Sequence, residues 1–227
     1  MLSFVVPVLN EATSIEGFLE SLRACYKQRC EIIVVDGGSQ DGTAALAAAH
    51  CDRVVLSTKG RAVQMNSGAR RALGTILCFV HADSRLPLHA DQSIRAALSQ
   101  QGRKWGWFDV RLSGGHPLLR VVEHLMNWRS RLTGIATGDQ ALFMTRTLFD
   151  AAGGFPDIAL MEDIAMSRKL KAMGPPARLQ QRLVTSSRRW EKYGILRTII
   201  LMWKLRLLYF LGADPTRLAQ RYYGRGV

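Results

Sequence analysis

A histidine and a carboxylate stand directly after an apolar run in this chain. His81, Ala82 and Asp83 follow Ile76–Val80. Mg²⁺ and Mn²⁺ prefer oxygen ligands and need few from the protein when phosphates complete the coordination. A neighbouring histidine suits Mn²⁺ better than Mg²⁺. We interpret Asp83 as a ligand of Mn²⁺ or Mg²⁺, with His81 as a second ligand or a hydrogen-bonding partner of a bound molecule. Simple capping of the next turn is the alternative.

A second group of candidate residues is cationic. Lys59-Gly60-Arg61 precedes a helix that is expected to begin near Ala62, and Gln64 lies one turn further along. Cations and backbone N–H groups at a helix N-terminus bind phosphate. Lys59, Arg61 and Gln64 are therefore candidates for a phosphate site, and a solvated basic turn is the alternative.

Acidic residues form a third group. Glu162 and Asp163 open a predicted helix, Asp163–Met173, and Asp139 lies in the polar quartet Thr137–Gln140. Two acids in the first turn are also what the helix dipole alone favours. A polar quartet before an apolar strand indicates a loop at a ligand site, which makes Asp139 a candidate for ligand contact.

The first half of the chain alternates apolar runs with amphipathic segments, which predicts a parallel sheet with right-handed crossovers. Ligands bind such sheets at the carboxyl ends of the strands. We therefore expect Glu11, Asp36 and His81-Ala82-Asp83 to meet at one edge. The predicted strands are Leu2–Val8, Glu31–Val35, Arg53–Leu56 and Ile76–Val80; the predicted helices are one after Asn10 or Thr13, then Thr43–His50 and Ala62–Leu73.

The second half is less regular, and neither a repeat nor a linker divides the chain. Its predicted elements are an edge or mixed strand at Trp105–Arg111, a short strand at Ala141–Met144, and helices at Leu118–Leu132, Asp163–Met173 and Ile195–Leu211.

The chain is strongly basic, with 31 Lys and Arg against 18 Asp and Glu, a net charge of +13. Such a surface attracts polyanions. The basic residues are mixed into apolar runs, and no helix-turn-helix, RNA-recognition or zinc signature is present, which argues against specific nucleic-acid binding. The four cysteines form no CxxC pair, which favours reduced thiols, and no signal peptide is recognisable at the N-terminus. Together these features predict a cytoplasmic protein.

The C-terminal segment Ile195–Ala213 is apolar but contains Arg197, Lys204 and Arg206. Three internal charges argue against a membrane-spanning helix. Two interpretations remain: an interfacial helix resting on an anionic bilayer at the inner face of the membrane, or packing against the domain or a second copy in a homodimer.

Four motifs occur in the order and spacing of family 2 glycosyltransferases. They are PVLNE at 7–11, IIVVDGGSQDGT at 32–43, FVHADSRLP at 79–87 and GGF…EDIAMSRKLKAMG at 153–174. SSRRW at 186–190 resembles the QxxRW element of that family. QMNSGA, TGDQALF and the tail RRWEKYGILRTIILMWKLRLLY are most similar to the subgroup called rSAM/selenodomain-associated transferase 2. The resemblance implies a GT-A fold, a nucleotide-diphosphate sugar donor (UDP by default, GDP as the other option) and inversion at the anomeric carbon. We expect residues 1–190 to form the GT-A domain, with a basic, apolar helical extension at 191–227.

The resemblance also implies roles for single residues. His81-Ala82-Asp83 occupies the DxD position of the family, with His81 in place of the first Asp. Gly37 stands where a second Asp commonly contacts the base, which leaves base recognition open. The implied donor contacts are Pro7, Leu9, Glu11, Asp36, Lys59, Arg61, Gln64, His81, Ala82 and Asp83.

By the same resemblance Asp163 is the general base that takes the acceptor's proton, and Glu162 positions it. Asp139 is implied to contact the acceptor or the donor sugar. Arg189 and Trp190 are implied to lie near the acceptor or the leaving diphosphate. Ser186 replaces the Gln of QxxRW, which argues against processive polymer synthesis.

Other functions fit part of these observations. A nucleotidyltransferase would share the strand-end carboxylates and the metal, but PVLNEATS replaces its Gly-rich GxGTR-like loop. A basic nucleic-acid-binding or membrane-binding protein with a degenerate GT-A site is the other alternative, since His81 and Gly37 depart from the family pattern. The acceptor is not identified, and membrane contact would favour a lipid-linked one.

Overall fold

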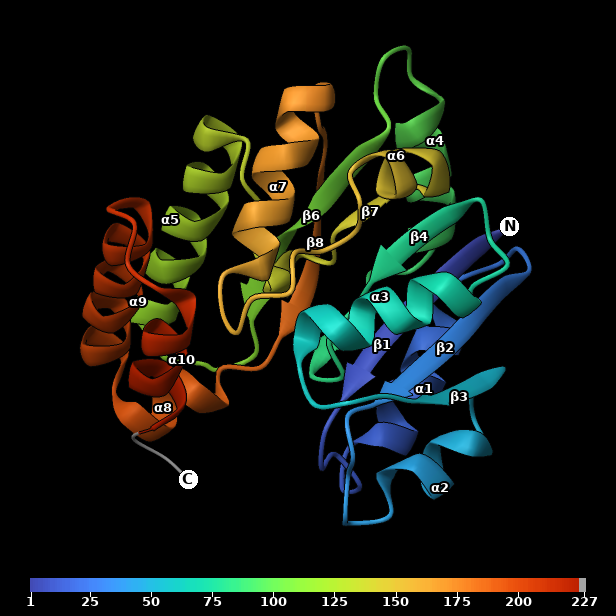
Figure 1. The fold of residues 1–227 in the computed structure, drawn as a ribbon, viewed down its shortest axis with the longest axis horizontal. Helices are drawn as coiled ribbons and strands as arrows, with labels where there is room; N and C mark the ends of the chain where they lie inside the picture. The colour runs from blue at the N-terminus through green and yellow to red at the C-terminus, as the bar shows by residue number, and fades with distance from the viewer. Residues whose placement is uncertain (225–227) are drawn as a thin grey trace.

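The computed structural model describes residues 1–224, and a single mixed sheet runs through them. Its strand order is β3-β2-β1-β4-β7-β6-β8-β5 (Figure 1). Strands β1 to β4 are parallel, β7 runs antiparallel to β4 and β6, and β6 is parallel to β8. The strands are β1 Leu2–Val8, β2 Cys30–Asp36, β3 Arg53–Leu56, β4 Ile76–Phe79, β5 Ser84–Arg85, β6 Trp105–Leu112, β7 Phe143–Thr145 and β8 Ala177–Thr185. The predicted α/β class with a mainly parallel sheet is confirmed.

Helices cover both faces of this sheet. They are α1 Ile15–Ala24, α2 Thr43–Ala48, α3 Arg61–Arg71, α4 Ala90–Ser99, α5 Pro117–Thr133, α6 Arg146–Ala151, α7 Glu162–Met173, α8 Arg188–Tyr193, α9 Ile195–Phe210 and α10 Pro215–Tyr223, with a 3₁₀ turn at Gly138–Gln140. In the part of the chain that the structure describes, no helix is both long and apolar enough to cross a bilayer.

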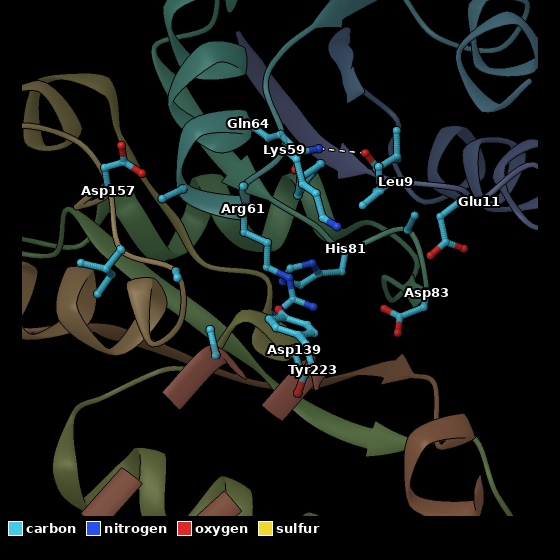
Figure 2. Close-up of a pocket in the computed structure, with 18 of the residues that line it drawn as sticks. Leu9, Glu11, Lys59, Arg61, Gln64, His81, Asp83, Asp139, Asp157 and Tyr223 are labelled. Atoms are coloured by element: carbon cyan, nitrogen blue, oxygen red, sulfur yellow. Dashed lines mark hydrogen bonds between the residues drawn. The ribbon is translucent and has the colours of Figure 1, made fainter. Parts of the chain in front are cut away.

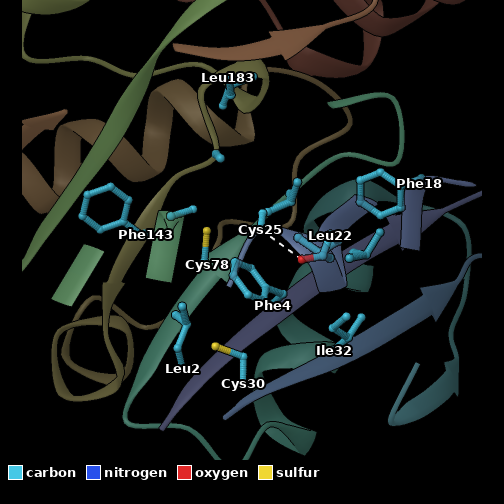
Figure 3. Packing of buried hydrophobic residues seen from close by; sticks show 14 of the residues in the cluster. Leu2, Phe4, Phe18, Leu22, Cys25, Cys30, Ile32, Cys78, Phe143 and Leu183 are labelled. Atoms are coloured by element: carbon cyan, nitrogen blue, oxygen red, sulfur yellow. Dashed lines mark hydrogen bonds between the residues drawn. The ribbon is translucent and has the colours of Figure 1, made fainter. Parts of the chain in front are cut away.

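The alternation of side chains along β1 divides the core into two layers. Leu2 and Phe4 pack on one face with α1 and α4, whereas Val5 faces α3 on the other. Figure 3 shows the first layer, where Cys25, Cys30 and Cys78 lie among the apolar side chains. Each fully buried aliphatic or aromatic side chain contributes roughly 1.5–3 kcal/mol, so these layers fix the strand ends in place.

The C-terminal helices are packed onto the rest of the chain. Leu205 of α9 and Leu218 of α10 are buried against Met161 and Ile164 at the start of α7. Figure 1 shows α9 and α10 beside α5 and α7. The division into a domain at 1–190 and an extension at 191–227 stays a prediction, and residues 225–227 of that extension lie outside the described part.

Three local predictions differ from the structure. Neither Asn10 nor Thr13 caps α1, which follows Ser14 without a side-chain cap; Asn10 has a left-handed backbone with φ 56°. Of the two alternatives for the strand at Trp105, the edge strand is wrong and the mixed strand is confirmed, because β6 lies between the antiparallel β7 and the parallel β8. β8 was not anticipated, since three consecutive polar residues, Gln180, Gln181 and Arg182, interrupt its apolar residues where the register shifts.

Candidate functional site

A cavity of about 630 Å³ opens at the carboxyl ends of β1 and β4 (Figure 2). Ten of the residues singled out in the sequence line it: Pro7, Leu9, Glu11, Lys59, Arg61, Gln64, His81, Ala82, Asp83 and Asp139. The structure thus brings the PVLNE, KGR and HAD segments and Asp139 to one place. The cavity has the size and the mixture of cationic and acidic groups that suit a polar, phosphorylated ligand.

Gln64 lines the cavity and connects the ends of β1 and β2. Its side chain is buried, and its Nε2 donates 2.8 Å hydrogen bonds to the carbonyl oxygens of Val8 and Val35, at the ends of β1 and β2. The Gln64 amide also gives a reason for glycine at position 37, because a Cβ there would lie 3.0 Å from the amide atoms. In this chain, therefore, a side chain at position 37 would have to displace the hydrogen-bonded Gln64 amide.

The loop after β1 is fixed to the loop after β2 by side-chain hydrogen bonds. The Glu11 N–H donates to Thr43 Oγ1 at 2.8 Å, and the Asn10 N–H donates to Ser39 Oγ at 2.8 Å. Asp36 stabilises the loop after β2, because its Oδ1 accepts hydrogen bonds from the N–H and the hydroxyl of Ser39. Its side chain is buried and does not line the cavity. The structure therefore places Glu11 in the cavity lining and Asp36 behind it.

The first turn of α3 presents cations to the cavity. Lys59 and Arg61 flank Gly60, whose φ of 146° is open to glycine and strained for other residues. Figure 2 shows Arg61 extending towards His81 and Asp139. Cationic side chains and N–H groups at the first turn of a helix are groups that can bind phosphate.

His81 and Asp83 fit a divalent metal. The Asp83 carboxylate is exposed to the cavity, and among residues 1–224 its one hydrogen-bond partner is the Ser84 hydroxyl, at 3.4 Å. Burial, helped by Arg61, lowers the pKa of His81 to about 3, so its ring is neutral and can act as a ligand. The described residues contain no cluster of three metal-ligating side chains, so a ligand diphosphate would supply the remaining coordination.

Asp139 lines the cavity from the turn at Gly138–Gln140. It is surrounded by protein, yet its side chain is accessible to solvent through the cavity. Burial, and then the charges of Asp83 and Asp163, raise its pKa to about 6, while Arg61 opposes the shift.

Glu162 and Asp163 lie behind this surface and do not line the cavity. Asp163 Oδ2 accepts from the Gly138 N–H at 2.6 Å, and its Oδ1 accepts from its neighbour Ile164 N at 2.7 Å. The Asp163 carboxylate therefore supports the turn that carries Asp139. Burial, followed by the charge of Asp163, raises the pKa of Glu162 to about 7.

Arg189 and Trp190 lie outside the cavity as well. The Arg189 guanidinium stacks over the Tyr222 ring, 3.7 Å from its centroid, and donates to the Tyr222 carbonyl oxygen at 2.8 Å. Trp190 lines a separate apolar groove between α5 and α9. Sequence patterns did not predict one wall of the 630 Å³ cavity, which α10 provides through Thr216, Ala219 and Tyr223. No motif marks these residues; the high amphipathicity of Pro215–Tyr223 was the available signal.

The fold is of the GT-A type. Residues 3–148 match Glycosyl transferase family 2, so the chain belongs to this family.

Several known proteins are similar to this chain. Dodecaprenyl-phosphate galacturonate synthase of Rhizobium johnstonii is 26% identical over 92% of this chain and 67% of its own length. Glycosyltransferase AglE of Haloferax volcanii is 33% identical over 36% of this chain and 30% of its own. Among solved structures, mannosyltransferase PcManGT of Pyrobaculum calidifontis, in complex with GDP-Man and Mn²⁺, has a TM-score of 0.62 at 24% identity, covering 81% of this chain and 56% of that one. TarS 1-349 of S. aureus with UDP has a TM-score of 0.67 at 18% identity, covering 82% and 60%. The chain thus spans only part of most of these relatives.

Proposed function

We propose that this protein transfers a sugar from a nucleotide-diphosphate sugar to an acceptor with inversion, using Mn²⁺ or Mg²⁺. The observation that carries this proposal is the position of Arg61, at the start of α3, opposite Asp83 in one cavity. The helix N-terminus, Lys59 and Arg61 bind the diphosphate, and Asp83 with His81 holds the metal. A bound metal would offset the charge that grows on the leaving diphosphate. The PcManGT and TarS complexes with nucleotide ligands support this use of the fold.

The donor nucleotide is proposed to be UDP, with GDP as the other option. Its base and ribose would lie beside Pro7, Leu9 and Glu11, which line the cavity at the end of β1. Gly37 is packed against Gln64, so base recognition at that point relies on backbone groups and not on a side chain.

For the general base, the geometry favours Asp139 over Asp163. Asp139 faces the cavity, whereas both oxygens of Asp163 accept backbone hydrogen bonds and its side chain does not line the cavity. We propose Asp139 as the residue that accepts the proton, with Asp163 and Glu162 positioning it. If Asp163 were instead the base, the turn at Gly138–Gln140 would have to move before reaction.

We further propose peripheral contact with an anionic membrane at its cytoplasmic face. α9 exposes Ile200, Trp203 and Leu207 in one stripe, with exposed fractions of 61–67%, beside the cations Arg197 and Lys204. An exposed apolar stripe flanked by basic residues suits the bilayer interface. All four cysteines lie in the described part and none is disulfide-bonded, in keeping with a reducing compartment. A homodimer through the same stripe is the competing arrangement, which light scattering would reveal.

The donor proposal is tested by thermal unfolding with UDP, GDP and their sugar conjugates, each with Mn²⁺, Mg²⁺ or EDTA. A ligand at a hundred times its Kd stabilises by about 2.7 kcal/mol, which moves the midpoint by several degrees. We expect one nucleotide to act only with metal, and Asp83→Asn to abolish the shift. Glu20→Gln, an exposed acid on α1, is the matched control. Failure of every nucleotide to shift the wild-type protein would refute the proposal.

A further inference from the structure

A second cavity, of about 410 Å³, lies between α5, α8 and α9 and is predominantly apolar. Met126, Trp128 and Leu132 line it from α5, and Met202 and Trp203 from α9. The side chains of Trp128, Leu132 and Trp203 are 61–65% exposed, so apolar surface continues from the groove onto the outside of the molecule. A groove of this composition accepts an aliphatic chain and excludes water from it.

One end of the groove is cationic. Arg129 and Arg206 line it, and neither forms a salt bridge with a carboxylate in residues 1–224. Arg129 donates to the Ser130 hydroxyl at 2.9 Å, while its Nε is buried without a partner. Burial lowers the pKa of both guanidiniums, and the charge of Arg206 further lowers that of Arg129, while the carboxylates of Asp163 and Asp139 offset these shifts only in part. An anion placed between the two guanidiniums would relieve their repulsion and satisfy their donors.

The cationic end opens towards the donor. Asp139 lines both the groove and the donor cavity, so it marks the place where the two meet. A molecule whose chain lies in the groove therefore has its head group beside Arg129 and Arg206, next to the position proposed for the donor sugar.

We propose that this groove binds the acceptor, a membrane lipid with a long aliphatic chain and a terminal phosphate. The chain lies between α5 and α9, and the phosphate lies between Arg129 and Arg206. This inference rests on the proposed function and names its acceptor class. Membrane contact through the exposed stripe of α9 would let the chain pass from the bilayer into the groove without crossing water.

The chemical step balances without an additional reactant. A phosphate oxygen of the lipid forms a bond to the anomeric carbon, while the bond from that carbon to the nucleoside diphosphate breaks and its electron pair leaves on the diphosphate. A phosphate dianion has no proton to lose. When the phosphate is a monoanion, its proton passes to Asp139. The products are a lipid-linked sugar phosphate and a nucleoside diphosphate.

Trp128, Trp190 and Trp203 line the groove and provide an intrinsic fluorescent reporter. The probes are dodecyl phosphate, dodecanol and inorganic phosphate, each titrated below its aggregation concentration. We expect dodecyl phosphate to bind at least tenfold more tightly than either of the others, since only it uses both the groove and the arginines. Hydrogen bonds to charged groups contribute about 1.5–3 kcal/mol each, so Arg129→Gln/Arg206→Gln should weaken dodecyl phosphate binding by at least about a hundredfold.

The control is Arg70→Gln/Arg71→Gln on α3, which removes the same charge from an exposed surface and should leave binding unchanged. Met202→Trp, which narrows the groove without changing its charge, should weaken dodecyl phosphate but keep the metal-dependent nucleotide shift. Equal affinity of the wild-type protein for dodecanol and dodecyl phosphate, or unchanged binding in both groove variants, would overturn the inference.

The two proposals fail separately in these measurements. Lipid phosphate binding without any nucleotide-induced shift supports the groove as a lipid site and refutes the donor reaction. A metal-dependent nucleotide shift without lipid phosphate binding overturns the acceptor inference alone.

Discussion

The contact between Gly37 and Gln64 predicts a reversal of sign in a double-mutant cycle. A Cβ at position 37 would stand 3.0 Å from three atoms of the Gln64 amide, which is itself held by two 2.8 Å hydrogen bonds. Gly37→Ala must therefore displace the amide by a few tenths of an ångström and weaken both bonds. Because each such bond contributes about 0.5–1.5 kcal/mol, we expect Gly37→Ala to destabilise the wild-type protein by about 1–2 kcal/mol.

In a Gln64→Ala background the amide group that a Cβ at position 37 would contact is absent. Gly37 does not have a positive φ, so alanine fits its backbone, and the loss of unfolded-state entropy should then stabilise the protein by about 0.4–1 kcal/mol. The coupling between the two positions would be about 2 kcal/mol, well above the error of additivity for independent sites. Urea unfolding of the four proteins measures it. If Gly37→Ala costs the same free energy in both backgrounds, Gln64 is not what excludes a side chain at position 37.

Three further outcomes are expected from buried charges and thiols. Arg131→Leu leaves the buried Asp109 of β6 without its ion-pair partner and should lower the free energy of unfolding in urea by about 2–3 kcal/mol. Arg111→Leu removes an exposed arginine from β6 and should change this free energy little. Similar losses in the two variants would contradict this expectation. In EDTA, the wild-type protein should gain stability relative to Glu162→Gln as the pH falls through about 7, because folded Glu162 takes up its proton there while the unfolded chain does so only near 4.5; profiles of the same shape for the two proteins would refute it. Burial raises the pKa of all four thiols, to about 12 at Cys25 and about 11 at Cys30, but only Cys51 is partly exposed, so it alone should react with Ellman's reagent at pH 8 before unfolding; more than one fast thiol would disprove it.

The parallel half of the fold follows from sequence because its signals are local. Each of the first four strands is a short apolar run that ends in polar residues, and the boundaries agree to within one residue. β8 lacks that signal, since the polar residues Gln180, Gln181 and Arg182 follow one another in its middle and leave no continuous apolar run. Pairing with the buried β6, a contact between distant parts of the chain, decides its conformation.

The candidate site shows the same limit at the level of side chains. Strand ends predict which segments approach the ligand, and Glu11, His81 and Asp83 all line the cavity. They do not predict which way a side chain turns. Asp36 turns into its own loop because Ser39 offers it two donors, and Asp163 is held by the backbone of the turn that carries Asp139. Such hydrogen bonds depend on loop geometry, which residue spacing does not encode.

The RRW segment illustrates how a motif acts through another element. Arg189 lines neither of the two cavities described above, but its stacking and hydrogen bond on Tyr222 attach α10, and α10 lines the donor cavity through Thr216 and Tyr223. The next residue, Trp190, lines the apolar groove. α10 lines the donor cavity and α9 lines the apolar groove. The helices after residue 190 therefore contribute directly to the surfaces on which donor and acceptor are proposed to meet. The basic, apolar tail is therefore better explained as part of the site than as an anchor added to a complete enzyme.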